Sequence, residues 1–241
     1  MIKGLYKYEL SNYLLSGKEI APLLAFIGWI GIAYTIGPIK ILKSFGLSSL
    51  VIFLIMLIIS IGYANIGNHM IEQSFYVKLK NKRNMYLSKV LVILTLSFAI
   101  SVLGILLPML IDITSKVALF SRTPTILDLS AGFLLLFTAS FSGGIIGLFL
   151  NKRVIKQHRV TIILSVFIGL LTILRGTLNE DFFFLRFITW ILPPVYELSS
   201  HFCNIEYFHV NDAFLYFIWM ILYTLAAIFF YVKLMLHKDF D

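Results

Sequence analysis

The polar residues whose spacing could serve chemistry lie at the end of the second apolar stretch of the chain. Asn65, then Asn68 or His69, and then Glu72 follow one another at intervals of three to four residues, so a helix places them on one face. Amide, imidazole and carboxylate groups on one face can hydrogen-bond a passing solute or a neighbouring helix. The spacing therefore predicts a polar lining near one mouth of that helix, with both uses open.

A basic segment overlaps this polar face and continues beyond it. Residues 72–89, EQSFYVKLKNKRNMYLSK, have a composition compatible with a helix and join the second apolar stretch to the third. The basic side chains of this segment are Lys78, Lys80, Lys82, Arg83 and Lys89. Such a segment favours one of two uses, a basic loop that fixes the orientation in the membrane or a docking helix for a partner protein.

Motifs for catalysis are absent from the sequence. It contains no G-x-x-x-x-G-K-[ST] phosphate loop, no H-E-x-x-H motif and no G-x-S-x-G motif. The five histidines are scattered, and together with the single Cys203 they make no metal-ligand spacing. We therefore predict that the chain is not an enzyme and that it binds no metal or cofactor itself.

Composition decides which solvent surrounds these side chains. Hydrophobic residues make up 59% of the 241 residues, charged residues make up 13%, and the mean hydropathy is +0.92. A soluble globule of this size would have to expose large apolar patches. The sequence therefore predicts an all-α integral membrane protein that forms one transmembrane domain over residues 1–241. The basic clusters carry no nucleic-acid-binding signature, so no nucleic-acid partner is expected.

Six apolar stretches approach the length of a transmembrane helix, which needs about 20 apolar residues. They are residues 20–38, 47–67, 87–111, 125–150, 160–178 and 211–236. One more apolar stretch, residues 182–195, is rich in aromatic side chains but short for a span. It suits a re-entrant or interfacial element between the fifth and sixth spans, and counting it as a span would give seven.

The distribution of charge favours six spans. With the amino terminus in the cytoplasm, six spans place fourteen of the twenty lysines and arginines on the cytoplasmic side, as the positive-inside rule requires. The excess positive charge of the chain, +8 in total, then lies entirely on that side. We expect a multi-pass protein of the cell membrane with both termini in the cytoplasm.

Charged residues within the spans are few. Asp112, Asp128 and Arg175 fall near the ends of spans, where we expect interfacial groups, with Arg175 reaching toward the membrane surface. Ion-coupled carriers usually need buried coupling charges, so that class is disfavoured, although Asp112 keeps it open.

Two further patterns concern packing and the membrane surface. Ala139, Gly143 and Gly147 form a ladder of small residues in the fourth span, which permits close approach of another helix, within the chain or across a subunit interface. Residues 1–16 mix aromatic, leucine and lysine side chains. This mixture is typical of an amphipathic helix in the headgroup layer.

These features together resemble the permease subunit of type 2 ATP-binding cassette exporters. Glu72 and the basic stretch that ends at Ser88-Lys89 are similar to the family's E…L…R…GK connection, without its Gly. ITWILPPVYELSSHF is similar to its L-S-P-x-Y/F segment, with Leu192 in place of the Ser and a doubled Pro. YVKLMLHKDF at the carboxyl terminus is a third likeness. Because the order of the predicted spans is also similar, the resemblance covers essentially the whole chain. Within the family, the chain resembles the lantibiotic-immunity and peptide-export group.

The resemblance implies a division of labour. Residues 72–89 would be the coupling helix and residues 1–16 an interfacial elbow helix. A second permease subunit, identical or paralogous, would complete the pathway within the membrane lipid. A separate cytoplasmic ATPase subunit would bind ATP and Mg. The implied substrate is a hydrophobic or amphipathic peptide, drug or lipid-like molecule that is exported. The rival interpretation is a non-transporting immunity or scaffold protein that binds a toxic peptide.

Overall fold

The computed structural model describes residues 2–34, 37–66, 81–114, 119–181, 189–208 and 210–237. Within those ranges the regular elements are the helices α1 (Ile2–Leu15), α2 (Ile20–Ala33), α3 (Ile41–Ala64), α5 (Arg83–Thr114), α6 (Ile126–Phe149), α7 (His158–Ile173), α8 (Arg175–Asp181), α10 (Val195–Asn204) and α11 (Val210–His237). The prediction of an all-α protein is confirmed for this part of the chain.

Four of these helices are long and apolar enough to cross a membrane. They are α3, α5, α6 and the Ala213–His237 part of α11. They coincide with the predicted spans at 47–67, 87–111, 125–150 and 211–236. A helix satisfies its backbone hydrogen bonds internally, and this is why an apolar run of such length is stable as a helix in lipid. The coincidence indicates a membrane-embedded protein.

The other two predicted spans are not continuous helices of membrane length. Residues 20–38 correspond to α2, which has 14 residues and is bent by 71° from α1. Gly17, with a φ of 66°, lies in the turn between α1 and α2 and allows that bend. Residues 160–178 correspond to α7, which has 16 residues. The described residues thus hold four candidate spans, or five if α1 and α2 form one bent span, and the count of six is not confirmed.

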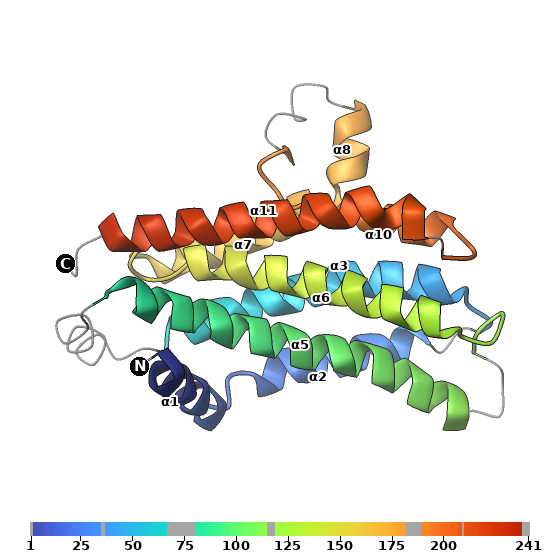
Figure 1. Ribbon diagram of the computed structural model, residues 1–241, viewed down its shortest axis with the longest axis horizontal. Coiled ribbons are helices and arrows are strands. Elements are labelled where there is room, and N and C mark those ends of the chain that lie inside the picture. Colours follow the sequence, from blue (N-terminus) through green and yellow to red (C-terminus); the bar gives the residue numbers. More distant parts are fainter. Residues whose placement is uncertain are drawn as a thin grey trace.

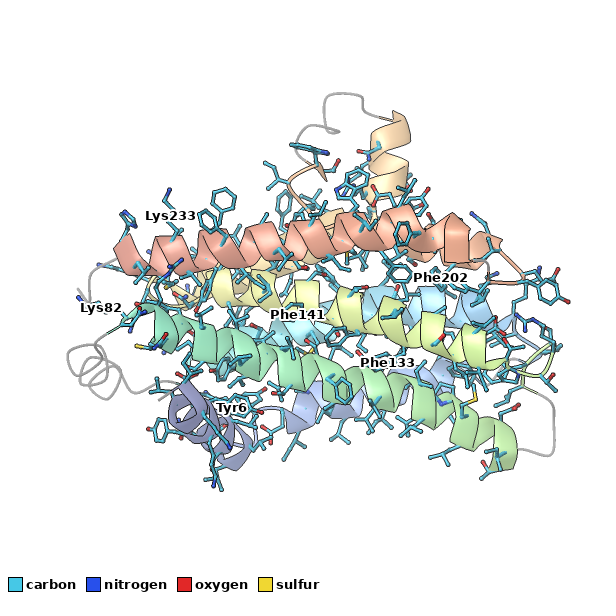
Figure 2. The ribbon with its side chains drawn as sticks, viewed as in Figure 1. Tyr6, Lys82, Phe133, Phe141, Phe202 and Lys233 are labelled. Atoms are coloured by element: carbon cyan, nitrogen blue, oxygen red, sulfur yellow. The ribbon has the colours of Figure 1, made fainter. Side chains whose placement is uncertain are left out.

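The long helices α3, α5, α6 and α11 run side by side along the longest dimension of the molecule (Figure 1). The first helix, α1, lies at the same end of this bundle as the last turn of α11. Lys82 and Lys233 also lie at that end (Figure 2). We call it the basic end, and we call the opposite end of the bundle the far end. The side of the membrane on which each end lies stays a prediction.

The centre of the bundle is α6, which packs against α3, α5 and α11. Phe133, Phe137 and Phe141 stack along α6, with ring centres 5.9 and 6.0 Å apart. Phe98 of α5 meets Phe133 edge-on at 5.5 Å. Figure 2 shows Phe133 and Phe141 on the same side of α6. This aromatic row lies along one side of α6 and adds a contact with α5 through Phe98.

Candidate functional site at the basic end

Two tyrosines fasten α1 to α3 at the basic end. The Tyr63 hydroxyl of α3 donates a hydrogen bond to the Glu9 carboxylate of α1. In the other direction, the Tyr13 hydroxyl of α1 donates to the carbonyl oxygen of Ile59 at 3.5 Å, and the two tyrosine rings meet edge-on at 5.5 Å. α1 packs against α5 as well. The predicted amphipathic helix at residues 1–16 therefore exists as a helix, and it is attached to two candidate spans.

One of the three predicted pathway residues falls within the described part of the chain. Asn65 follows the last turn of α3, and its Nδ2 donates to the Ile61 carbonyl at 2.9 Å. Its Oδ1 accepts a hydrogen bond from the Lys152 backbone N–H at 3.2 Å. Asn65 thus connects the end of α3 to the turn after α6. Asn68 and His69 lie outside the described residues.

The predicted coupling residues divide between two parts of the chain. Glu72, Lys78 and Lys80 lie outside the described residues. Lys82 and Arg83 are exposed at the basic end, and Arg83 begins α5. Lys89 is half-buried in the second turn of that helix. The last part of the 72–89 segment therefore belongs to the membrane-length helix α5, and the connection between α3 and α5 ends by Lys82.

The segment after α6 is fastened to two other helices at the same end. Arg153 donates from Nη1 to the Tyr86 hydroxyl of α5 at 3.1 Å. Tyr86 meets Tyr231 of α11 edge-on at 6.4 Å, and Phe149 of α6 meets Tyr231 at 5.6 Å. Asn151 accepts from the Arg153 backbone N–H at 2.9 Å, which fixes the turn that carries Arg153. The basic end is therefore a connected network that includes α1, α3, α5, α6 and α11.

The predicted ladder of small residues lies where α6 crosses α3. A Cβ added to Gly143 would overlap the Phe53 carbonyl oxygen, and one added to Gly147 would lie 2.7 Å from the Leu57 carbonyl oxygen. Ala139 is fully buried on the same helix. Ser60 of α3 donates to the Gly144 carbonyl at 2.5 Å. The two backbones are close enough here for a side-chain hydroxyl of one helix to bond the main chain of the other.

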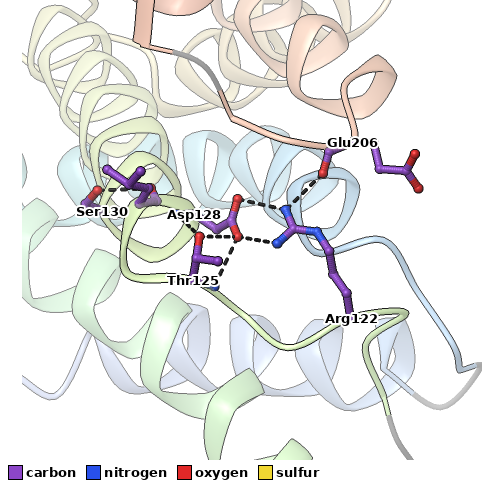
Figure 3. A network of polar contacts seen from close by, with 6 residues as sticks. Arg122, Thr125, Asp128, Ser130 and Glu206 are labelled. Carbon is purple, nitrogen blue, oxygen red and sulfur yellow. Dashed lines mark hydrogen bonds and ion pairs between the residues drawn. The ribbon is translucent and has the colours of Figure 1, made fainter.

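Figure 3 shows a second polar network, at the far end. Arg122 donates from Nη1 and Nη2 to the two carboxylate oxygens of Asp128 at 2.6 and 2.9 Å, and Nη2 also donates to the Glu206 carbonyl at 2.9 Å. Asp128 accepts from the Thr125 N–H and hydroxyl, and its own N–H donates to Thr125 Oγ1, a capping box that begins α6. The bonds to Asp128 raise the pKa of Arg122 above its ordinary value, so the pair stays ionised.

This network connects the loops that precede α3, α6 and α11. The Arg122 guanidinium lies 4.6 Å from the centre of the Tyr207 ring, and Lys40 Nζ lies 3.6 Å from Glu206 Oε1. The Ile39 N–H donates to the Leu119 carbonyl at 2.8 Å, and this forms a short bridge between the first two of these loops. The far end is thereby closed by polar links between loops distant in sequence.

A helix break separates α7 from α10. α7 ends at Ile173, and α8 projects from the side of the bundle in Figure 1. Arg175, the first residue of α8, is only 4% exposed, and its Nε lies 2.7 Å from Oε1 of Glu197 in α10. Gly176 packs directly on the Tyr196 ring. These contacts turn the chain after α7, and this is the physical reason why the fifth predicted span is not continuous.

The two helices on either side of this break, α7 and α10, cover different parts of α3. Gly169 of α7 faces Leu54 in the middle of α3, and Gly46 near the start of α3 faces Ser199 and Cys203 of α10. Ser199 donates to the Gly46 carbonyl at 2.7 Å. α7 and α10 therefore share one side of α3 between them, with α8 emerging from the gap. Half of the predicted re-entrant stretch 182–195, residues 182–188, lies outside the described residues.

Three charged pairs among the described residues were not predicted from the sequence, Arg122 with Asp128, Arg175 with Glu197 and Lys40 with Glu206, and all three lie away from the basic end. The first, between Arg122 and Asp128, has a signal in the T-x-x-D spacing of Thr125 and Asp128, which is typical of a capping box. For the second, between Arg175 and Glu197, the only signal in the sequence is the pair of prolines before α10. These prolines indicate where a helix starts but not that Glu197 meets Arg175. The prediction that Arg175 reaches toward the membrane surface is wrong because its guanidinium is enclosed by α10 and the turn before it.

A comparison with models of protein families, with curated proteins and with solved structures finds no match to this chain. Among the described residues, no group of three or more histidine, cysteine, aspartate or glutamate side chains is placed to hold a metal ion.

Proposed function

We propose that this chain is the permease subunit of an ATP-binding cassette exporter for a hydrophobic or amphipathic substrate, with ATP hydrolysed by a separate subunit. The observation that carries the proposal is the arrangement at the basic end. There α1 is fastened to α3 through Tyr63 and Glu9, and the basic segment joins the end of α3 to the start of α5. A partner that binds this segment therefore acts on α1, α3 and α5 together.

The packing of the bundle supports a mechanical role for that arrangement. α3 and α6 are in backbone contact at Gly143 and Gly147, and Ser101 of α5 lies 3.1 Å from Ser140 of α6 through their hydroxyl oxygens. Helices packed this closely move as one body. A displacement applied at the basic end is then transmitted along α3, α5 and α6 to the Arg122 network at the far end.

The side of the bundle that contains the helix break supports the remaining part of the proposal. α7 and α11 expose long rows of apolar side chains, including Phe167, Leu170 and Phe230, which lipid or a second permease subunit would cover. α8 projects from that side. We assign to this region the contact with the second permease subunit and the release of an apolar substrate.

The test is to neutralise the basic segment and to measure coupling. The variant carries Lys78→Gln, Lys80→Gln, Lys82→Gln and Arg83→Gln. We expect the complex with the ATPase subunit, purified from native membranes and reconstituted in nanodiscs, to lose at least about ten-fold of its substrate-stimulated ATP hydrolysis, because one hydrogen bond to a charged group contributes about 1.5–3 kcal/mol. Thermal unfolding of the permease should be unchanged.

The matched control also removes four positive charges at the basic end, from exposed residues of other segments. It carries Lys152→Gln, Lys156→Gln, Arg159→Gln and Lys233→Gln. Equal loss in both variants would show a general charge effect and not a docking segment. If no ATPase subunit co-purifies with the chain from native membranes, the proposal is wrong. Protection against a toxic peptide that persists after deletion of the ATPase would instead favour the immunity or scaffold role.

A further inference from the structure

A groove of about 320 Å³ opens at the basic end between the start of α5 and the last turns of α11. Polar side chains line one part of it: Asn81, Arg83 and Asn84. Apolar side chains line the rest, among them Leu87, Leu225 and Phe229. Neither the ladder of small residues nor the Arg122 network takes part in it, so it is a separate feature of the molecule.

The groove faces away from the bundle. Behind it, α5 and α11 are held together by Tyr86 and Tyr231, whose rings meet edge-on and are each 1% exposed. Leu87, Leu225 and Phe229 remain exposed on the outer sides of the same two helices. Since both helices are candidate spans, the open side of the groove is directed at the surrounding lipid.

Polarity changes along the groove in one direction. Its polar residues lie at the first turn of α5 and just before it, where the amino-terminal end of the helix dipole is positive. Its apolar residues on α11 extend back from Val232 to Leu225, roughly 10 Å along the helix and toward the middle of the bundle. A membrane has the same order of polarity, with charged headgroups above the apolar chains.

The charge at the polar part is positive. Arg83 is exposed there, Lys82 precedes it, and Lys233 lies at the same end of the bundle (Figure 2). No carboxylate is among the described residues that line the groove. Basic pockets between membrane helices near the headgroup layer are suited to anionic lipid headgroups. A soluble protein is a poor occupant of the apolar part, because that wall lies on two candidate membrane spans.

We propose that this groove binds an anionic phospholipid, with its phosphodiester at Arg83 and one acyl chain along Leu87, Leu225 and Phe229. The phosphate accepts hydrogen bonds from the Arg83 guanidinium, and the Asn84 amide is beside it. The acyl chain of the lipid fills the space between α5 and α11 beyond the Tyr86–Tyr231 contact. The bound lipid joins the start of α5 to the end of α11, and this inference does not depend on the transport proposed above.

The experiment uses the delipidated full-length chain in a neutral detergent, without any partner, and counts retained lipid by native mass spectrometry. Phosphatidylglycerol and phosphatidylcholine are titrated separately. We expect preference for phosphatidylglycerol, and Arg83→Gln should weaken its apparent affinity about five-fold, the effect of about one basic group near an anionic lipid. Arg159→Gln, which removes an exposed arginine from α7 at the same end, should leave the affinity unchanged.

A second variant tests the apolar wall that would hold the acyl chain, without altering the charge of the groove. Leu225→Trp fills the apolar part of the groove and should also weaken phosphatidylglycerol binding. Leu222→Trp, an exposed position of α11 outside the groove, should not. Three results would each overturn the proposal: equal effects of Arg83→Gln and Arg159→Gln, unchanged binding in Leu225→Trp, or displacement of the lipid by inorganic phosphate alone. The last result would identify a simple anion site.

Discussion

The two sides of α3 are held by different kinds of interaction. On one side, α6 lies against α3 through glycines that leave no room for a Cβ, and the contact extends from Phe45 to Ser60. On the other side, α7 and α10 divide the length of α3 between them and are separated by a break. Their connection relies on the ion pair between Arg175 and Glu197.

The difference shows how one bundle can combine a rigid part with a part that can rearrange. The contact of α3 with α6 is distributed over many small interactions, so no single side chain dominates it. The connection of α7 to α10 depends on one ion pair, between Arg175 and Glu197. Removing either partner is costly because it leaves the other charge without compensation. The connection of α7 to α10 is therefore expected to be more sensitive to a single substitution than the contact of α3 with α6.

The largest effect is expected from Arg175→Ala. The substitution leaves Glu197 partly buried without its cation and removes the bond from Arg175 Nη1 to the Leu192 carbonyl, which measures 3.0 Å. Removing one partner of a buried pair costs about 3–5 kcal/mol. We expect a loss of that order in the free energy of unfolding, measured by titration with sodium dodecyl sulfate.

The control for this prediction is Arg159→Ala, an exposed arginine at the start of α7, which should change the free energy of unfolding by less than about 0.5 kcal/mol. The double variant Arg175→Met with Glu197→Leu should recover most of the loss, because it removes both charges. A double variant as unstable as Arg175→Ala would mean that packing around α8, and not the ion pair, connects α7 to α10.

The same contrast explains which parts of the structure the sequence predicts. α3, α5, α6 and α11 follow from apolar runs of membrane length, and the spacing of Ala139, Gly143 and Gly147 marks the side of α6 that meets another helix. The end of α7 at Ile173 is marked only weakly, by Arg175 and Gly176 directly after Leu174. It depends on Arg175 meeting Glu197, and no local pattern connects two residues on separate helices.

The sequence is equally limited at the basic end. The periodic spacing of Asn65, Asn68 and Glu72 predicts one helix face, of which only Asn65 lies in the described residues, and Asn65 follows the end of α3 and bonds to the turn after α6. The last carbonyl groups of α3 accept hydrogen bonds from Asn65 and Ile66 directly after the helix, whereas the Lys152 N–H that bonds to Asn65 comes from a segment distant in sequence. A helix at residues 1–16 was predictable from the sequence. The attachment of α1 to α3 through Glu9 was not, because Tyr63 lies far away in the sequence.

An intermediate effect is expected from Gly143→Ala on the other side of α3. The new methyl group meets the Phe53 carbonyl oxygen, which is main chain and cannot rotate away. Overpacking of this kind costs about 1–3 kcal/mol. We expect a corresponding decrease in the free energy of unfolding in the same detergent titration.

Gly62→Ala is the matched control, because Gly62 lies in α3 and an added Cβ there has no neighbour within 4 Å. It should stabilise the protein by about 0.5–1 kcal/mol, the helix-propensity difference between the two residues. If Gly143→Ala proves as harmless as Gly62→Ala, the two helices can separate, and the assignment of α3 and α6 to one rigid body is wrong.

The smallest effect is expected from Ser60→Ala, which removes the 2.5 Å hydrogen bond to the Gly144 carbonyl but leaves the glycine contacts in place. Side-chain hydrogen bonds between membrane helices contribute about 0.6 kcal/mol on average. Ser165→Ala provides the comparison, because the Ser165 hydroxyl bonds only the Ile162 carbonyl within its own helix in the described structure. A decrease several times larger for Ser60→Ala would mean that the contact of α3 with α6 also depends on one dominant polar link, and the contrast between the two sides of α3 would then disappear.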